Sequence, residues 1–509
     1  MKSFIFYIYT LLLVSLANGQ KGRPNILVIF SDDHAQQAIS AYGGKLMQTP
    51  NIDRIANEGA IFRNSFVTNS LCAPSRAAFL TGKYGHLNGL IDNSPGRRFD
   101  GSQEQIQKIL HQQNYQTAWI GKWHLQSLPQ GFDYWNILPD QGNYFQPDFI
   151  NMKNDTVRHG GYVTDLISDF SIDWLNQRDR SNPFFLVVGE KATHREWMPD
   201  IQDLGAFDDI DFPLPVNFFD DYKDRRAAFE QDMTVRKTMV LATDLKVKTD
   251  YTSRGTYGRM SAIQKDAYQQ YYKKVEAEYE KIKNDSLALI KWKFQRYLKD
   301  YLSTAKSMDR NIGRILKYLD STGLAKNTIV IYTSDQGFYM GEHGWFDKRF
   351  MYEESFRTPM VMRYPGYIKP NTQVKDLVMN IDLAPTLLEL AGLAAATEMQ
   401  GKSFTPLLKE KSAPRDWRKS VYYHYYEYPD PHRVAPHFGI RTEQYKLIRF
   451  YGPHDDWELF EIRKDPTEMK NLIHDQKYAS IIQTLKKELS ELATQYKDTA
   501  ALQIMNSEQ

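Results

Sequence analysis

One short stretch holds the only cysteine of this 509-residue chain. It reads SLCAPSRAAFLTG, from Ser70 to Gly82, and it places Cys72 two residues before Pro74, a residue type common in the first turn of a helix. The amide groups of a helix N-terminus stabilise a nearby anion and lower the pKa of a thiol. The stretch therefore combines a thiol that could react with a position that could bind a sulfate or phosphate. A lone cysteine forms no internal disulfide, so an inert buried thiol or a link between chains are the alternatives.

Four side chains with oxygen donors occur in two pairs that are far apart in the sequence. Asp32 and Asp33 form the first pair, and Asp335 and Gln336 form the second. Hard divalent cations prefer such ligands, whereas the Cys/His cluster of a structural zinc site is absent from the sequence. Three carboxylates in one place would repel one another without a cation. The two pairs therefore predict a metal site.

Several basic side chains have the chemistry to bind a tetrahedral oxyanion. Arg76 can offer two donors to it, and Lys122 and Lys348 can add point charges. His124 and His194 could donate to the same anion or serve as acid and base. Each of these residues alone is more often a surface charge, but the two lysines lie close in sequence to other candidates.

Four apolar runs of strand length lead into most of these residues. Continuous runs of β-branched and aromatic residues are typical of strands buried on both faces, as in a parallel sheet. Helical patterns at 101–113 and 304–319 alternate with them and predict an α/β fold. Ligands in such folds bind outside the carboxyl ends of the strands, so we expect one assembled site. The runs are 25–30, 117–120, 184–188 and 328–333.

The rest of the chain predicts two further parts. Residues 200–300 are charged and rich in tyrosine, and we expect a mostly helical insertion there. After a glycine-capped helix at 382–392, the segment 409–420 is typical of a linker. Short alternating segments beyond it, such as 445–451, predict a small antiparallel sheet closed by an amphipathic helix at 480–496. We therefore expect a catalytic domain over 20–410 and a smaller C-terminal α+β subdomain over 415–509.

The first residues predict export. Lys2 precedes an apolar run that is shorter than a membrane span and that ends in the small residues Ala17-Asn18-Gly19. We interpret residues 1–19 as a signal peptide and expect a periplasmic or secreted protein. The run is not followed by a cysteine, and no later segment is apolar enough to span a bilayer. We therefore expect no membrane anchor.

The composition argues against some classes of protein and partner. The 64 basic and 62 acidic residues leave a formal net charge of +2, which gives no reason to expect nucleic acid as a partner. The apolar fraction of 42% and the charged fraction of 25% are those of an ordinary globular protein. The length predicts two or more domains.

The stretch Cys72-Ala-Pro-Ser-Arg76, followed by Leu80-Thr-Gly82, resembles the signature of the formylglycine-dependent type I sulfatases, Cys-x-Pro-Ser-Arg followed by Leu-Thr-Gly. The resemblance covers nearly the whole chain after residue 19. It continues in NILVIFSDD, GKWH, YTSDQGFYMGEHG, DKRFMYEES and ELFEIRKDPTEMKNL. It implies an alkaline phosphatase-like fold, with a large, mixed, mainly parallel sheet between helices, and a sulfuric ester hydrolase.

The resemblance also implies roles for single residues. In that family a formylglycine-generating enzyme or an anaerobic sulfatase-maturating enzyme oxidises the cysteine to formylglycine (3-oxoalanine), so Cys72 becomes the nucleophile. Arg76 stabilises the formylglycine, and Lys122 and Lys348 bind sulfate. His124 and His194 flank the nucleophile and the leaving group. One calcium ion is held by Asp32, Asp33, Cys72, Asp335 and Gln336, the last in place of the commoner Asn or His.

The sugar is not defined by these residues, because specificity depends on surrounding loops. Candidate substrate contacts are Arg195, His343 and His437. The pattern is most similar to bacterial sulfatases of sulfated glycans, including relatives of the N-acetylglucosamine-6-sulfatases. It is also similar to enzymes that degrade algal polysaccharides such as ulvan and carrageenan, and both substrate classes stay open.

Two other functions compete with a sulfatase. A phosphodiester or phosphonate hydrolase of the same superfamily would have a similar metal site. A glycan-binding relative without activity is the second, but the presence of Cys72, Arg76, Lys122 and Lys348 together disfavours it.

Overall fold

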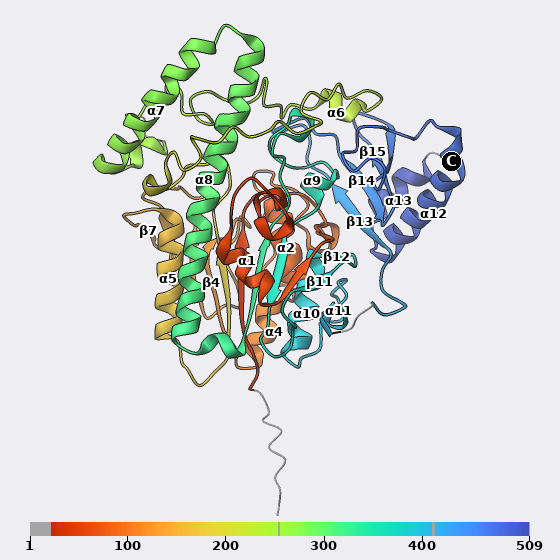
Figure 1. The fold of residues 1–509 in the computed structure, drawn as a ribbon. Helices are drawn as coiled ribbons and strands as arrows, with labels where there is room; N and C mark the ends of the chain where they lie inside the picture. Colours follow the sequence, from red (N-terminus) through yellow and green to blue (C-terminus); the bar gives the residue numbers. More distant parts are fainter. Residues whose placement is uncertain (1–21, 253–254, 410–412, 508–509) are drawn as a thin grey trace, which may run out of the picture.

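The computed structural model describes residues 22–252, 255–409 and 413–507, so the expected signal peptide lies outside the described residues. The main feature is a ten-stranded sheet with the order β11-β2-β10-β9-β1-β8-β4-β5-β6-β7 (Figure 1). Its strands are β1 (Asn25–Ser31), β2 (Ala60–Phe62), β4 (Gln116–Lys122), β5 (Tyr134–Leu138), β6 (Asp148–Ile150), β7 (Thr156–Arg158), β8 (Phe184–Gly189), β9 (Thr328–Ser334), β10 (Met360–Arg363) and β11 (Thr372–Val374).

The centre of this sheet is parallel. Strands β9, β1, β8, β4 and β5 run in one direction, whereas β10, β6 and β7 pair antiparallel with their neighbours toward the edges. All seven residues of β1 are buried, as expected for a strand covered on both faces. The predicted α/β fold with a mixed, mainly parallel sheet is therefore confirmed. Two short strands, β3 (Ser65–Phe66) and β12 (Val378–Met379), pair separately.

Helices cover both faces of the sheet (Figure 1). Residues of β1 point alternately to the two faces, so Ile26 packs in one apolar cluster and Leu27 in another. The cluster of Leu27 includes residues of α1 (Pro50–Asn57), α5 (Val163–Gln177) and α8 (Ser286–Ser321). The cluster of Ile26 includes residues of α2 (Cys72–Thr81), α4 (Ile106–Gln112), α10 (Leu383–Leu390) and α11 (Thr405–Lys409); α3 (Gly85–Asn88) contacts α2.

The 200–300 segment is helical only in its second half. Helix α7 (Ala262–Ile282) and the first part of α8 rise above the sheet in Figure 1, but residues 204–252 are mostly turns and loops with one short helix, α6 (Arg226–Glu230). Pro213, Pro215 and many Asp residues favour turns over helix in that half. The expectation of a mostly helical insertion was therefore wrong for these residues.

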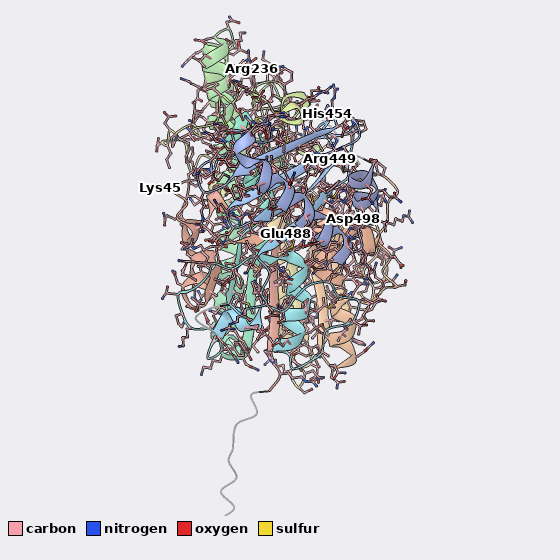
Figure 2. The ribbon with its side chains drawn as sticks, turned by 90° about the vertical axis from the view of Figure 1, so that its right-hand side faces the viewer. Lys45, Arg236, Arg449, His454, Glu488 and Asp498 are labelled. Atoms are coloured by element: carbon pink, nitrogen blue, oxygen red, sulfur yellow. The ribbon has the colours of Figure 1, made fainter. Side chains whose placement is uncertain are left out.

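The C-terminal part is an antiparallel sheet with helices against it, as predicted. Figure 2 is turned to show this side, with Glu488 labelled on one of its helices and Asp498 labelled just before the last one. The Asp498 carboxylate accepts hydrogen bonds from the Ala501 amide, the Tyr422 hydroxyl and the His424 ring, so it ties the last helix to the first strand. The elements are β13 (Ser420–Tyr425), β14 (His437–Thr442), β15 (Tyr445–Phe450), β16 (Asp456–Glu461), α12 (Ala479–Gln495) and α13 (Thr499–Asn506).

This sheet shares one apolar cluster with the segment 339–356, which contains α9 (Glu353–Phe356). The domain boundaries at 410 and 415 stay a prediction. Among the described residues, none of the helices is both long and apolar enough to cross a membrane.

Candidate active site

The four central strands end beside one another. They lie in the order β9, β1, β8, β4, and their carboxyl ends are level, because Ser31 pairs with Ser334 and Gly121 pairs with Gly189. The residues that follow β1 and β9, and the last residue of β4, therefore meet at one edge of the sheet. The predicted assembly of candidate residues at strand ends is observed.

A pair of glycines lets β4 and β8 approach closely at this edge. Gly121 has a φ of +99°, and a Cβ atom there would lie 2.1 Å from the carbonyl oxygen of Gly189. Asp33 and His124 also adopt left-handed backbone conformations, with φ of 60° and 57°. Such conformations cost of order 1–3 kcal/mol each and concentrate at functional sites.

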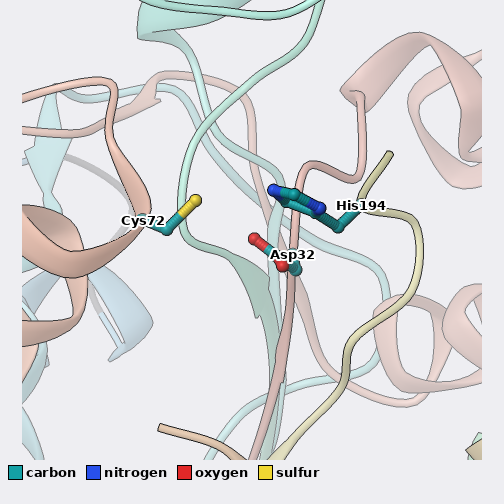
Figure 3. Close-up of side chains that lie close together, drawn as sticks. All are labelled: Asp32, Cys72 and His194. Atoms are coloured by element: carbon teal, nitrogen blue, oxygen red, sulfur yellow. The ribbon is translucent and has the colours of Figure 1, made fainter. Parts of the chain in front are cut away.

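Cys72 is the first residue of α2, and its side chain is buried against the strand ends. Figure 3 shows its sulfur atom, the Asp32 carboxylate and the His194 ring turned toward one another. Ligand atoms of Asp32, Asp33, Cys72 and Asp335 all lie within 4.8 Å of one another, and so do those of Asp32, Cys72 and His194. The structure thus joins five of the predicted site residues around one point.

The predicted cations pair with these carboxylates. Lys122 Nζ donates to Asp32, and Lys348 Nζ lies 2.6 and 2.8 Å from the two oxygens of Asp33. Lys348 Nζ is also 3.4 Å from the sulfur atom of Cys72. All four charged side chains are almost entirely buried. Lys348 therefore places positive charge directly beside the side chain of residue 72.

Arg76 binds Asp335, one residue of the second oxygen-donor pair. Its Nε and Nη2 atoms donate to the same Asp335 oxygen, at 3.2 and 3.1 Å, and its Nη1 atom donates to the carbonyl oxygen of Lys122 at 2.8 Å. The guanidinium group also lies over the ring of Phe30. Arg76 is thus fixed on both sides and holds three strand ends together.

The donor set fits a hard divalent cation. Asp32 Oδ1 and Gln336 Oε1 are buried and have no hydrogen-bond partner among the described residues. Gln336 donates its amide to Asp33, so its carbonyl oxygen remains for a ligand. Burial and neighbouring carboxylates raise the pKa of Asp335 to about 8, a repulsion that a bound cation would offset. Carboxylate and amide oxygens are what calcium prefers.

The Cys72 thiol differs from its prediction in one respect. A helix N-terminus lowers the pKa of a thiol, but here burial and the nearby Asp32 raise the pKa of Cys72 well above its usual value. Desolvation outweighs the helix amides because the side chain is only 1% exposed. The unmodified Cys72 side chain therefore forms a thiolate only with difficulty.

The two site histidines have defined surroundings. His194 Nδ1 lies 2.7 Å from the Arg195 carbonyl oxygen, which only accepts, so Nδ1 carries the proton. Its Nε2 atom lies 3.9 Å from Asp33. Burial lowers the pKa of His194 well below its usual range and that of His124 to about 4.

The three predicted substrate contacts lie in different surroundings. His343 is fully buried, bonds Asp220 at 2.6 Å, and packs among aromatic rings. His437 is fully buried in the core of the C-terminal sheet, between the Ala435 carbonyl and the Met351 amide. Neither side chain has exposed surface in this structure, and their role as substrate contacts stays a prediction. The structure does not bring them to the cluster around Cys72.

Arg195 does border a pocket at the site. Its guanidinium forms two bonds with Asp244, at 2.7 and 2.6 Å. The pocket has a volume of about 370 Å³. It is lined by Gln141, Gly142, Asn143, Tyr144, Lys191, His194, Arg195, Glu196, Thr243, Asp244 and Thr256.

Two residues of this pocket were missed by sequence reasoning. Lys191 Nζ donates to the Gln141 carbonyl at 3.1 Å and lies 4.7 Å from the centre of the Tyr144 ring. Its position, directly after a predicted strand and three residues before His194, was a usable signal. Gln141 lies on a loop and carries no such signal.

Comparison with known proteins identifies the family. The family model described as Sulfatase matches residues 24–393, well over half of the chain. The chain belongs to the sulfatase family. A second model, N-sulphoglucosamine sulphohydrolase, C-terminal, matches residues 341–495 of this sulfatase. The predicted sulfuric ester hydrolase is therefore confirmed.

The sulfatase has a similar curated relative along nearly its whole length. It is 48% identical to an N-acetylglucosamine-6-O-sulfatase of Bacteroides thetaiotaomicron, over 96% of this chain and 89% of the relative. It is 25% identical to the ulvan-active sulfatase of Formosa agariphila, over 93% and 83% of the two chains. A solved structure of a protein in complex with its substrate D-glucosamine-2-N,6-O-disulfate matches with a TM-score of 0.91 and 48% identity, covering 94% and 98%.

Proposed function

We propose that this sulfatase removes the 6-O-sulfate group from N-acetylglucosamine or glucosamine units of sulfated glycosaminoglycans. The observation that carries the proposal is the 48% identity, over 96% of the chain, to an N-acetylglucosamine-6-O-sulfatase. The structural neighbour bound to a 6-O-sulfated glucosamine, with a TM-score of 0.91, supports the same sugar. The ulvan-active relative is only 25% identical, which makes the algal substrate the second candidate.

The site residues of this chain would divide the work as follows. Lys122 and Lys348, both buried at the strand ends, bind the oxygens of the sulfate group. Lys348 also stabilises negative charge on residue 72, because its ammonium group lies 3.4 Å from the Cys72 sulfur atom. Arg76 keeps Asp335 in place through two bonds to one oxygen.

His194 is suited to proton transfer to the sugar. Its Nδ1–H group is bound to the Arg195 carbonyl, so only Nε2 can take up a proton. We assign His194 to proton transfer at Nε2, which must first take up a proton before it can give one to the leaving sugar oxygen, because His194 lies in both the metal cluster and the pocket of about 370 Å³. The pocket would hold the sugar, with Arg195 at its wall.

Two groups that the chain does not encode would complete the site. The residues that would hold a calcium ion are Asp32, Asp33, Asp335 and Gln336, with residue 72 beside them. When present, calcium polarises the sulfate group, and the hydrate of a formylglycine made from Cys72 supplies the attacking oxygen. A formylglycine-generating or anaerobic maturating enzyme would be the partner that makes it. Export to the periplasm or beyond the cell would fit a protein that acts on external glycans.

The test compares sulfate release by the natural protein, Cys72→Ser and Cys72→Ala, with peptide mass spectrometry of residue 72. We expect formylglycine in the active protein, and release from N-acetylglucosamine 6-sulfate far above that from galactose 6-sulfate or ulvan oligosaccharides. Both variants should keep the fold and lose turnover in a host that does not convert serine. Faster turnover of phosphonate or phosphodiester substrates would replace the proposal with the competing hydrolase.

A further inference from the structure

Gln141 connects three basic residues at the mouth of the site. It lies in a turn closed by a hydrogen bond from the Gly142 amide to the Pro139 carbonyl at 2.9 Å. Its backbone carbonyl accepts from Lys191 Nζ at 3.1 Å, which fixes the turn to the end of β8. Its side-chain amide lies between Lys122 and His124, two residues of the neighbouring strand end.

The orientation of this amide follows from its partners. An ammonium group only donates hydrogen bonds, so the atom of Gln141 that contacts Lys122 Nζ is the oxygen Oε1. The other end of the amide is therefore the NH₂ group. It lies 2.9 Å from Nε2 of His124. Because this group only donates, His124 Nε2 must accept and carries no proton.

The consequence concerns the opposite ring nitrogen. A neutral imidazole with an unprotonated Nε2 carries its proton on Nδ1. His124 Nδ1 is buried and has no hydrogen-bond partner among the described residues. A buried donor without a partner costs about 1–3 kcal/mol, and a ligand that accepts a hydrogen bond from Nδ1 would remove this cost. A sulfate oxygen is the acceptor that the neighbouring Lys122 would bring to it.

We infer that Gln141 is a positioning residue of the sulfatase reaction: its amide holds Lys122 and fixes His124 as an Nδ1–H donor to the substrate sulfate. The inference rests on the proposed roles of Lys122 and His124. It assigns a mechanistic role to a loop residue that belongs to none of the sequence motifs.

One neighbouring group opposes the effect of Gln141 on the His124 proton. The Asp140 carboxylate lies 3.4 Å from His124 Nε2 and would favour a proton there. Its side chain is 71% exposed, so water screens it, whereas the Gln141 contact is shorter. The other charges that act on His124 are Lys122, Arg76 and Asp32. Without the Gln141 amide, Asp140 would be the remaining partner of His124 Nε2, and the proton would move from Nδ1 to Nε2.

Two substitutions separate the functions of the amide. Gln141→Leu removes both bonds, whereas Gln141→Glu keeps an acceptor for Lys122 and replaces the donor toward His124 by a carboxylate. Asp140→Asn in the same turn is the matched control, because it leaves the amide in place. Sulfate release from N-acetylglucosamine 6-sulfate is measured as kcat, KM and their pH profiles. The ¹⁵N signals of the His124 ring, assigned by their loss in His124→Asn, are recorded on the same proteins.

For Gln141→Leu we expect kcat to fall about 10- to 100-fold with KM close to its natural value, as is typical when a supporting residue is lost. For Gln141→Glu we expect the pKa of the His124 ring, followed by its ¹⁵N signals, to rise by about 1 unit or more, because a carboxylate beside an imidazole favours the imidazolium. The ring signals should show Nδ1–H in the natural protein and Asp140→Asn, and an Nε2–H or doubly protonated ring in the two Gln141 variants.

Unchanged kcat in Gln141→Leu, or the same His124 ring signals in all proteins, would overturn the inference. Failure of the proposed function looks different. In that case the natural protein releases no sulfate from this sugar, while the ring signals still report whether Gln141 sets the His124 proton.

Discussion

Replacement of His437 by glutamine tests the structural place of this residue and gives a stability change that can be worked out. The ring donates from Nδ1 to the Ala435 carbonyl at 2.8 Å and accepts at Nε2 from the Met351 amide at 3.1 Å. Both bonds require the neutral form, and burial lowers the pKa of His437 from 6.5 to about 3. Glutamine offers one donor and one acceptor but does not titrate.

The sign of the effect follows from the lowered pKa. Above pH 6.5 both the folded and the unfolded protein hold a neutral ring, so His437 adds its full stability there. As pH falls from 6.5 toward 3, the unfolded chain binds a proton that the folded chain refuses, and stability is lost. With these two pKa values, unfolding at pH 5 takes up about one proton at this site, and the loss relative to pH 8 is about 2 kcal/mol.

Proton uptake on unfolding is the direct assay, because it does not depend on a two-state transition. Unfolding at pH 5 in weakly buffered urea should take up about one proton fewer in His437→Gln than in the natural protein. The variant should also lose less of its stability between pH 8 and pH 5, and its kcat/KM should stay unchanged. Equal uptake by the two proteins would contradict the buried neutral ring. A large rise in KM would instead restore His437 as a substrate contact.

Two further changes test how the strand ends are held. Gly121→Ala should lower kcat several-fold and reduce stability, because the new methyl group would lie 2.1 Å from the Gly189 carbonyl oxygen and displace Lys122. Sulfate release measures the first effect and thermal unfolding the second, with Ala118→Gly on the same strand as the control. Full activity of Gly121→Ala would refute this prediction. Arg76→Met should destabilise by about 1–3 kcal/mol, because it leaves the buried Asp335 carboxyl without its hydrogen-bond partner. Asp335→Asn in the same chain should restore part of this stability in urea unfolding, and equal stability of the single and double variants would refute the pairing.

Residues at strand ends were predictable because sheet geometry does the positioning. Once 25–30 and 328–333 are recognised as parallel strands, their carboxyl ends must lie at one edge of the sheet, so Asp32 and Asp335 must lie at that edge. The same argument places Lys122 there, at the end of β4. The strand order, which makes Asp32 and Asp335 neighbours, came from the structure and not from the sequence.

Properties that depend on burial could not be read in the same way. The helix amides at Cys72 are a local feature visible in the sequence, whereas the burial that raises its pKa depends on how distant parts of the chain pack, and the charge of Asp335, which raises it further, lies hundreds of residues away. His343 and His437 follow motif or tyrosine-rich segments, as a substrate contact would, yet both are enclosed by aromatic rings. A histidine in or next to a motif is therefore weak evidence of a substrate contact until its packing is known. Gln141 shows the converse, because this uncharged loop residue lies outside every motif and takes its proposed role from the one donor, Lys122, and the one acceptor, His124, that its amide contacts.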